Sequence, residues 1–328
     1  MRNNVSIHAK TVKIALGILV IIAAFLVPQV VTDAYYLHLI SMSLIWTIMT
    51  QGLNIIQGYT GYVSLAQASF FGIGAYASAL LTLKTDLSSW AALPVAILVT
   101  TVIGALIGYP IFRTKGHYFA IVTMAFCVIT WIVMVTWESL TGGDAGLPNV
   151  PAPKSVFGIN FADKSNYYYI LLIFVLLTLL FVHRLIHSKI GRSLISIREN
   201  EQLAQAIGVS LTRYKLLAFS ISAGLAGLSG SLYAHYVRYV NPTPFSIDYS
   251  LNAILAVILG GSGTIAGPII GSFLLVFLPE YLRIAEEYRL LIYSLMLILI
   301  TIYFPKGIIH LLSVAWRSLR GRGLTRKQ

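Results

Sequence analysis

The side chains most able to do chemistry in this chain are amides and hydroxyls set among glycines in a segment without strong charge. Residues 34–83 contain no Asp, Glu, Lys or Arg, and a shorter glycine-rich group follows near residue 260. Glycine-broken backbone and amide groups are tolerated at membrane depth only where they are buried in protein or line a cavity. We therefore predict that a polar solute passes along these residues, although the same amides could serve only to hold helices together. The candidate pathway residues are Asn54, Gln57, Gly61, Ser64, Gln67, Gly260, Gly263 and Thr264.

The sequence lacks the residue patterns of a catalyst or a metal site. It has no Gly-x-x-x-x-Gly-Lys-Ser/Thr phosphate loop and no His-Glu-x-x-His motif. Carboxylates are missing from the middle of every apolar run, whereas proton- or sodium-coupled carriers generally need ionisable groups there. We expect no enzyme activity, no metal and no cofactor held by this chain. Any energy for transport must then come from a partner.

Composition places the chain in the bilayer as one membrane domain. Hydrophobic residues make up 57% of its 328 residues and charged residues 10%, against about 25% charged in soluble proteins. The net charge of +12 does not indicate a nucleic-acid partner, because the basic residues gather in alternate loops and in both tails. This positive-inside distribution predicts that both termini are cytoplasmic. We divide the chain into a cytoplasmic tail (1–13), a transmembrane domain (14–304) and a basic cytoplasmic tail (305–328).

Ten apolar segments are candidate membrane spans. The eighth and ninth are uncertain, because residues 249–279 form one uncharged stretch broken by glycines. The basic C-terminal tail reaches the cytoplasm only if this stretch ends on the side from which it started. An all-α polytopic protein with ten spanning helices, or with eight and a re-entrant hairpin, meets that condition. The predicted spans are residues 14–32, 37–56, 62–83, 90–110, 118–137, 167–187, 214–237, 249–263, 264–282 and 288–304.

Two further patterns concern how these helices pack. Gly58-Tyr-Thr-Gly61 and Gly260-Gly-Ser-Gly263 each precede an apolar segment with two more glycines, which is a weak internal repeat. Paired glycine-interrupted helices in two halves of a transporter indicate a translocation site at the repeat interface. Both could equally be tight cytoplasmic turns. Ala223, Gly227 and Ser231 fall four residues apart, a spacing that favours close approach of another helix.

A short charged segment, residues 189–213, lies on the predicted cytoplasmic side. Asn200 can cap a helix whose first turn carries Glu201, and Gly208 can end it. Such a helix is too short to be stable alone in water. Its apolar face has no obvious cover in the chain, so we expect it to dock into a groove of a partner. The alternative is a solvated helix lying on the membrane surface. The residues of this face are Leu203, Ala204 and Ile207.

Residues 37–310 resemble the membrane-spanning permease subunit of bacterial ABC importers for branched-chain amino acids. The resemblance rests on several motifs taken together. They are Gly52-Leu-Asn-Ile-Ile-Gln-Gly-Tyr-Thr-Gly-Tyr-Val-Ser-Leu-Ala-Gln67, Lys115-Gly-His-Tyr-Phe119, Thr141-Gly-Gly-Asp-Ala-Gly-Leu147, Arg198-Glu-Asn-Glu201 with Ala204 and Gly208, and Gly260-Gly-Ser-Gly-Thr264 with Gly267-Pro268.

The resemblance implies that residues 191–208 seat in an ATPase subunit, and that ATP is bound by partner subunits. It also implies a homologous second permease, two ATP-binding subunits, a soluble substrate-binding protein, and a position in the lipid of the bacterial plasma (inner) membrane. Urea or short amides are the alternative cargo, and a passive channel for a small neutral solute is the alternative class. A channel has no need of a docking helix, which argues against it. The implied coupling residues are Arg198, Glu199, Glu201, Ala204 and Gly208.

Overall fold

The structure is a computed structural model, and it is built from α-helices. It describes residues 19, 22–31, 33–85, 87–113, 116–155, 158, 160–282, 292, 295, 298 and 307–309. Within these residues there is no β-strand, and the one extended pairing is an isolated bridge between Leu147 and Val240. The helices are α2 (Ala34–Thr60), α3 (Gln67–Lys84), α4 (Ser89–Ile111), α5 (His117–Thr136), α6 (Glu138–Thr141), η1 (Gly143–Ala145), α7 (Lys164–His187), α8 (Lys189–Glu199), α9 (Glu201–Ala206), α10 (Leu211–Val237), η2 (Thr243–Phe245), α11 (Ile247–Gly260) and α12 (Ala266–Tyr281).

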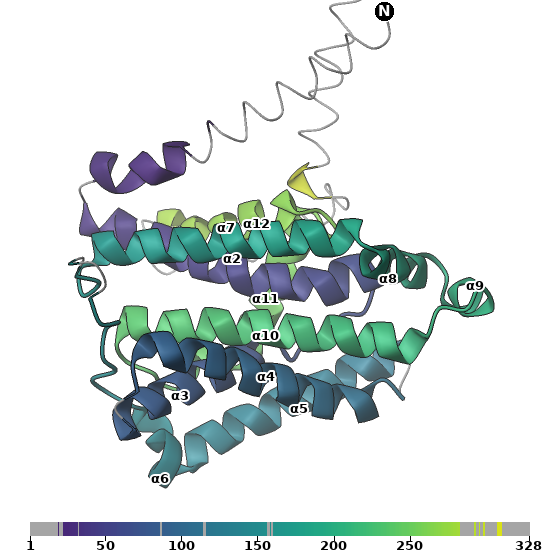
Figure 1. The fold of residues 1–328 in the computed structure, drawn as a ribbon, viewed down its shortest axis with the longest axis horizontal. Helices are drawn as coiled ribbons and strands as arrows, with labels where there is room; N and C mark the ends of the chain where they lie inside the picture. The colour runs from purple at the N-terminus through teal and green to yellow at the C-terminus, as the bar shows by residue number, and fades with distance from the viewer. Residues whose placement is uncertain are drawn as a thin grey trace, which may run out of the picture.

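Helix α10 is the centre of the bundle, and α2, α3 and α4 pack around it (Figure 1). The small residues predicted to permit close packing lie at these contacts. A Cβ added at Gly227 would come within 2.1 Å of the Thr100 hydroxyl on α4, and one added at Gly74 on α3 would meet the Gly227 backbone at 2.4 Å. Ser229 also donates to the carbonyl of Ile45 on α2 at 2.7 Å. The packing interpretation of this small-residue motif is confirmed.

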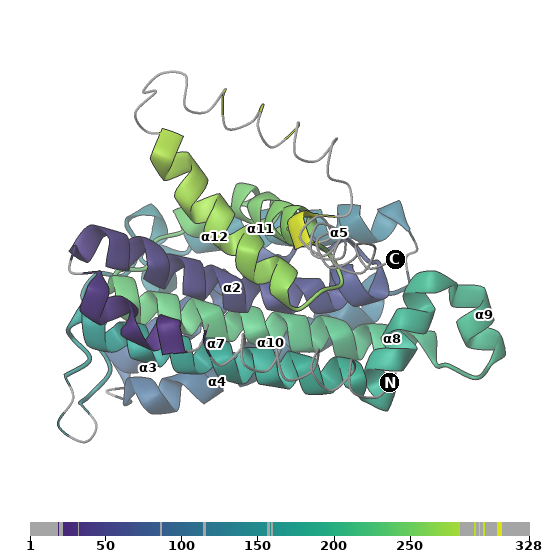
Figure 2. The same cartoon turned by 90° about the horizontal axis from the view of Figure 1, so that it is seen from above.

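The long helices run side by side, and their connections gather at two opposite ends of the molecule (Figure 1, Figure 2). Helices α8 and α9 lie at one end, and α6 lies at the other. At the α6 end, Trp90 donates to the carbonyl of Lys154, and His235 bonds to the carbonyl of Pro151. Successive connections lie alternately at the two ends, which agrees with the order of loops from which the sidedness was predicted. Which end faces the cytoplasm stays a prediction.

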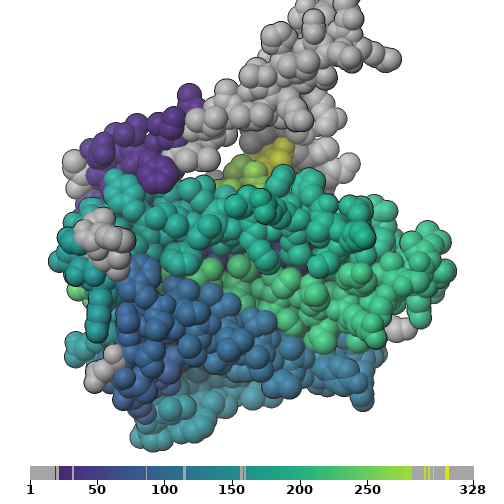
Figure 3. Space-filling model, in the orientation of Figure 1, coloured from purple at the N-terminus to yellow at the C-terminus, as the bar shows by residue number. Residues whose placement is uncertain are grey.

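In the part of the chain that the structure describes, five helices, α2, α4, α5, α7 and α10, are long and apolar enough to cross a bilayer. The outer helices α4, α5 and α7 leave most of their apolar surface exposed, and α7 (teal) and α4 (blue) cover much of the face in Figure 3. Helices α2 and α10 are mainly buried. The all-α, polytopic fold is thus confirmed, while the count of ten spans stays a prediction. The predicted span 288–304 and both tails lie largely outside the described residues, as does part of the span 14–32.

Helices α11 and α12 form a short antiparallel hairpin. Cβ atoms added at Gly260 and Gly271 would collide with the backbones of Gly267 and Ala256, which fixes the two helices in opposite directions. The helices have 14 and 16 residues, so they are about 21 and 24 Å long at 1.5 Å per residue. Both are shorter than the ~30 Å hydrocarbon core. The hairpin agrees with the predicted return of the chain to its starting side, and the choice between two crossings and re-entry stays open.

Candidate functional site

The connection between α7 and α10 is built from two short helices that meet at Asn200. Ser188 caps α8 by accepting hydrogen bonds from the backbone amides of Ile190 and Gly191. Asn200 has an extended backbone, and its side chain accepts from the amide of Leu203. It therefore ends α8, and it caps α9 as the sequence predicts. We call this junction of α8 and α9 the elbow.

The end of α9 is also as predicted. Gly208 adopts a left-handed φ of +88°. Its amide donates to the carbonyl of Gln205, and the amide of Val209 donates to the carbonyl of Ala204. This pair of hydrogen bonds is the Schellman motif, which favours glycine at this position because other residues are strained there. Gly208 therefore shapes the end of the helix.

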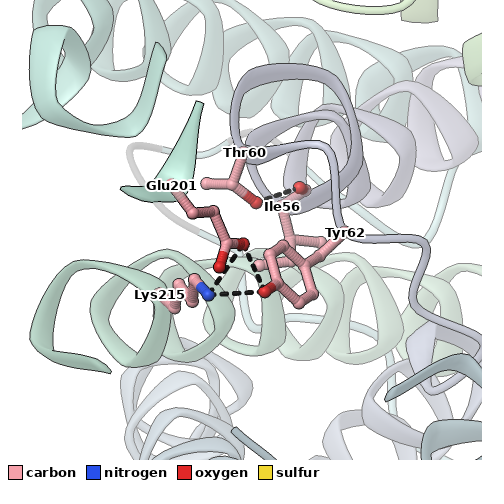
Figure 4. A network of polar contacts seen from close by, with 5 residues as sticks. All are labelled: Ile56, Thr60, Tyr62, Glu201 and Lys215. Carbon is pink, nitrogen blue, oxygen red and sulfur yellow. Dashed lines mark hydrogen bonds and ion pairs between the residues drawn. The ribbon is translucent and has the colours of Figure 1, made fainter. Parts of the chain in front are cut away.

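Glu201, the first residue of α9, lies in a closed ring of polar contacts with Lys215 and Tyr62 (Figure 4). Lys215 Nζ is 2.9 Å from Glu201 Oε1. The Tyr62 hydroxyl donates to the same oxygen and accepts a hydrogen bond from Lys215. The Lys215 ammonium also lies 4.3 Å from the centroid of the Tyr62 ring. Three segments meet in this ring: α9, the start of α10, and the connection between α2 and α3.

Because the ring is largely buried, its stability depends on all three side chains. The side chain of Lys215 is 6% exposed and that of Glu201 is 32% exposed. A buried ammonium needs a partner, because an unpaired buried charge is costly. Burial, and then the hydrogen bond and charge of Glu201, raise the pKa of Tyr62 above its usual range. A phenol is protonated at neutral pH even at its ordinary pKa of about 10, so the Tyr62 hydroxyl is the donor in its hydrogen bond with Glu201.

Arg198, on the other side of the elbow, contacts the glycine-rich turns. Its Nη1 donates to the carbonyl of Gly58 at 2.5 Å. A Cβ added at Gly263 would lie 2.5 Å from the same nitrogen, and one added at Gly61 would lie 3.4 Å from Arg198 Cγ. The two turns of the predicted internal repeat therefore lie together beside α8.

Asn54, on α2 four residues before Gly58, ties this helix to the second turn. Its Oδ1 accepts from the amide of Gly263 at 2.9 Å, and its Nδ2 donates to the carbonyl of Thr264 at 2.8 Å. The Asn54 side chain is fully buried. Thr264 in turn accepts from the amide of Gly267 near the start of α12. Both ends of the Asn54 amide are thus bonded within the chain, which is what a helix-holding role requires.

Gln67 is held in the same way, whereas Gln57 is not. Gln67 donates to the carbonyl of Met49 at 2.8 Å and accepts from the Ser222 hydroxyl at 3.1 Å. Ser64 is buried, and its hydroxyl accepts from a backbone amide two residues further on. Gln57 is also buried, but among the described residues its Oε1 has no hydrogen-bond donor. Gln57 is therefore the pathway candidate with an unused acceptor.

One prediction about α9 is wrong. The sequence places Ala204 on an uncovered apolar face with Leu203 and Ile207, but only the latter two are exposed, at 63% and 70%. Ala204 is 1% exposed. Residues four apart stack on one side of a helix, whereas the next residue is turned by about 100°. The side of α9 that carries Ala204 therefore packs inward toward α8 and α10, and only Leu203 and Ile207 are left to contact a partner.

A recess of about 450 Å³ opens beside the elbow. The exposed side chain of Glu199 lines it together with Arg198, His117 and the connection after α2. Of the predicted coupling residues, Arg198, Glu199 and Gly208 are exposed, Glu201 is partly buried and Ala204 is buried. Lys115, the first residue of the motif that leads into α5, lies outside the described residues. Among the described residues, no cluster of His, Cys, Asp or Glu could hold a metal.

Sequence reasoning missed Tyr62 and Lys215 as members of the site. Lys215 had a usable signal, because it is the last charged residue before the long uncharged part of α10, which is rich in small residues. A lysine there needs a carboxylate, and Glu199 and Glu201 are the nearest along the chain. The choice between these two, and the part played by Tyr62, depend on contacts between distant segments.

Comparison with known proteins gives a consistent result. The family described as branched-chain amino acid transport system / permease component matches residues 35–301. The chain is 32% identical to the high-affinity branched-chain amino acid transport system permease protein LivM of Salmonella typhimurium, over 93% of this chain and 77% of that protein. It is 25% identical to the high-affinity branched-chain amino acid transport system permease protein LivH of Escherichia coli, over 80% of this chain and 91% of that protein. The ribose import permease protein RbsC of Haemophilus influenzae is 23% identical over 88% of this chain. No solved structure matches the chain.

Proposed function

Because this chain belongs to the branched-chain amino acid transport permease family, we propose that it is a permease subunit of an ABC importer and forms part of the route by which branched-chain amino acids cross the membrane. The observation that carries its mechanism is the contact of the elbow with the glycine-broken turns. Arg198 donates to the carbonyl of Gly58 and lies beside Gly263, and Glu201 accepts from Tyr62, which follows Gly61. A passive channel would have no use for such a joint. ATP is bound by partner subunits in this proposal.

The elbow is the proposed docking site for an ATPase subunit. The exposed side chains of Leu203 and Ile207 would enter a groove of the ATPase, as short amphipathic helices do in other complexes. Glu199, the last residue of α8, is also exposed and available to a partner. Arg198 and Glu201 would pass a movement of the docked ATPase from the elbow to the membrane helices. Ala204 packs the inner side of α9, and Gly208 ends this helix. Leu203 and Ile207 thus take the docking role that the sequence predicts for Leu203, Ala204 and Ile207 together.

The importer is proposed to contain a second, homologous permease, two ATP-binding subunits and a soluble substrate-binding protein. The relatives named LivM and LivH are both described as permease proteins of a branched-chain amino acid transport system. The greater identity to LivM supports a LivM-like place for this chain beside a LivH-like partner. The complex would lie in the bacterial plasma membrane, with both termini of this chain in the cytoplasm.

The route for the amino acid is proposed to follow the connection after α2 and the turn before α12. A zwitterion that leaves water needs amides, hydroxyls and freed backbone groups, because an unpaired charge in the membrane is costly. The unused Oε1 of Gln57 supports a binding role for this side chain. Asn54 and Gln67 are bonded within the chain, so they would serve the substrate only by exchanging those bonds during transport. Gly61, Ser64, Gly260, Gly263 and Thr264 complete the proposed route.

The test of function is uptake in a bacterial strain from which this chain has been deleted. Restoring the chain should restore uptake of labelled leucine, isoleucine or valine, with dependence on ATP. Urea is measured in parallel as the alternative cargo. Uptake of urea alone would change the substrate class, and uptake that persists without ATP would indicate a passive channel.

A further inference from the structure

We propose that Lys215 and Tyr62 are positioning residues for energy coupling. Together with Glu201 they make α9, the start of α10 and the connection between α2 and α3 move as one body. The inference rests on the proposed function, because it concerns how the elbow passes the work of an ATPase to the membrane helices.

The first step of the argument is the weakness of α9 on its own. The helix has six residues, which is far fewer than an isolated helix needs for stability in water. Its outer side chains, Leu203 and Ile207, are exposed. A force applied to these side chains reaches the membrane helices only as far as the inner contacts of α9 hold. The nature of those inner contacts therefore decides whether the force is transmitted.

The second step is the character of the ring formed by Glu201, Lys215 and Tyr62. Lys215 donates to Tyr62 and pairs with Glu201, and Tyr62 donates to Glu201, so each member contacts both of the others. Hydrogen bonds with an ionised partner are roughly twice as strong as neutral ones. Lys215 is 6% exposed, so salt and water screen the pair less than at an open surface. The ring is therefore a stiff joint.

The third step is the geometry around the elbow. Arg198, just before Asn200, donates to the carbonyl of Gly58. Glu201, just after Asn200, accepts from Tyr62. Two contacts from opposite sides of one cap residue thus hold the end of α2 and the connection after it. A tilt of the elbow must displace this connection, which carries the proposed route.

The joint is tested first in the isolated chain, which needs no partner. Cys127 is replaced by Ala, and a spin label is attached to a cysteine at the exposed position of Gln205 on α9. We expect the label to become more mobile in Lys215→Met and Tyr62→Phe than in the parent. Arg213→Met is the matched control, because Arg213 is an exposed base two residues away on the same helix. Equal mobility in all four proteins would overturn the stiff joint.

The coupling role is tested in the assembled importer in vesicles, where uptake and ATP hydrolysis are measured together. For Lys215→Met and Tyr62→Phe we expect hydrolysis to continue while the amino acid taken up per ATP falls about tenfold or more, the scale of a typical coupling free energy. The exchanged pair Glu201→Lys with Lys215→Glu should recover part of the loss. Uptake and hydrolysis that fall together, at a constant ratio, would show a purely structural role and overturn the proposal. If the unaltered importer transports no amino acid, the proposed function fails instead. The spin-label experiment on the isolated chain then still tests whether the ring holds α9 in place.

Discussion

Asn54 and Gly263 are 209 residues apart in the sequence, yet the amide of the glycine donates to the side-chain oxygen of the asparagine at 2.9 Å. The other end of the same side chain holds the carbonyl of Thr264. One buried amide therefore ties α2 to the second glycine-rich turn, and the first turn lies against it, since a Cβ added at Gly263 would be 3.0 Å from the carbonyl oxygen of Gly58. Arg198 reaches the same place from the elbow. The weak internal repeat thus has a physical meaning as a contact between its two copies.

Removing the Asn54 amide should weaken this contact. Asn54→Ala leaves the amide of Gly263 and the carbonyl of Thr264 without their partner, at about 1–3 kcal/mol for each group left unsatisfied. We expect a lower midpoint of thermal unfolding in detergent, followed by tryptophan fluorescence. Gln202→Ala, at an exposed position on α9, is the control and should leave the midpoint unchanged. An unchanged midpoint in Asn54→Ala would mean that the turns are held by other contacts.

The exposed and buried sides of α9 should respond differently to a new charge. Leu203→Asp should keep the fold and reduce association with the ATPase, because burying a leucine side chain contributes about 1.5–3 kcal/mol. Ala204→Asp places a charge inside the chain and should also lower the unfolding midpoint of the isolated permease. Pull-down with the ATPase and thermal unfolding separate the two effects. A Leu203→Asp protein that binds the ATPase as tightly as the parent would exclude docking through this face.

Accessibility labelling should place the two ends of the molecule on opposite sides of the membrane. Single cysteines at Ala145, at the α6 end, and Ser196, on α8, are introduced after Cys127→Ala. An impermeant thiol reagent added to intact cells should label Ala145→Cys and leave Ser196→Cys unlabelled until the membrane is opened. The expectation follows from the excess of basic residues in the loops at the α8 end. Labelling of both sites in intact cells would contradict the topology.

Residues along the proposed route should differ in how they affect transport. Gln57→Leu removes an acceptor with no donor among the described residues, so we expect reduced uptake with little loss of stability. Gln67→Leu breaks two hydrogen bonds within the chain and should lower both uptake and stability. Uptake in vesicles and unfolding midpoints are the two measurements.

The same route is probed with thiol reagents in the assembled transporter. Ser64→Cys and Gln67→Cys should be blocked by a bulky reagent in at least one nucleotide state, with loss of uptake. If neither cysteine reacts in any state, or both react fully while uptake continues, these side chains only hold helices together.

The sequence predicts the helices well because their signals are local. Charges and glycines bound the apolar runs, so α4, α7 and α10 begin and end within a few residues of the predicted spans. The caps of α9 at Asn200 and Gly208 are likewise encoded by neighbouring residues. The ring around Glu201 could not be predicted in this way, because Tyr62 lies 139 residues from its carboxylate partner. The inward turn of Ala204 also depends on which helices surround α9.

Because α10 lies at the centre of the bundle, the helices that are synthesised before it cannot complete their packing until it has been made. Helices α3 and α4 bury their small-residue faces against α10, yet α10 begins at Leu211, long after α4 ends at Ile111. At 5–20 residues per second the ribosome needs roughly 5–20 seconds to make that intervening chain. During this interval the two earlier helices are in the membrane without the neighbour they are shaped to fit. Lipid or the insertion machinery must shield these faces, and a nascent chain that stops before α10 is a natural target for membrane proteases.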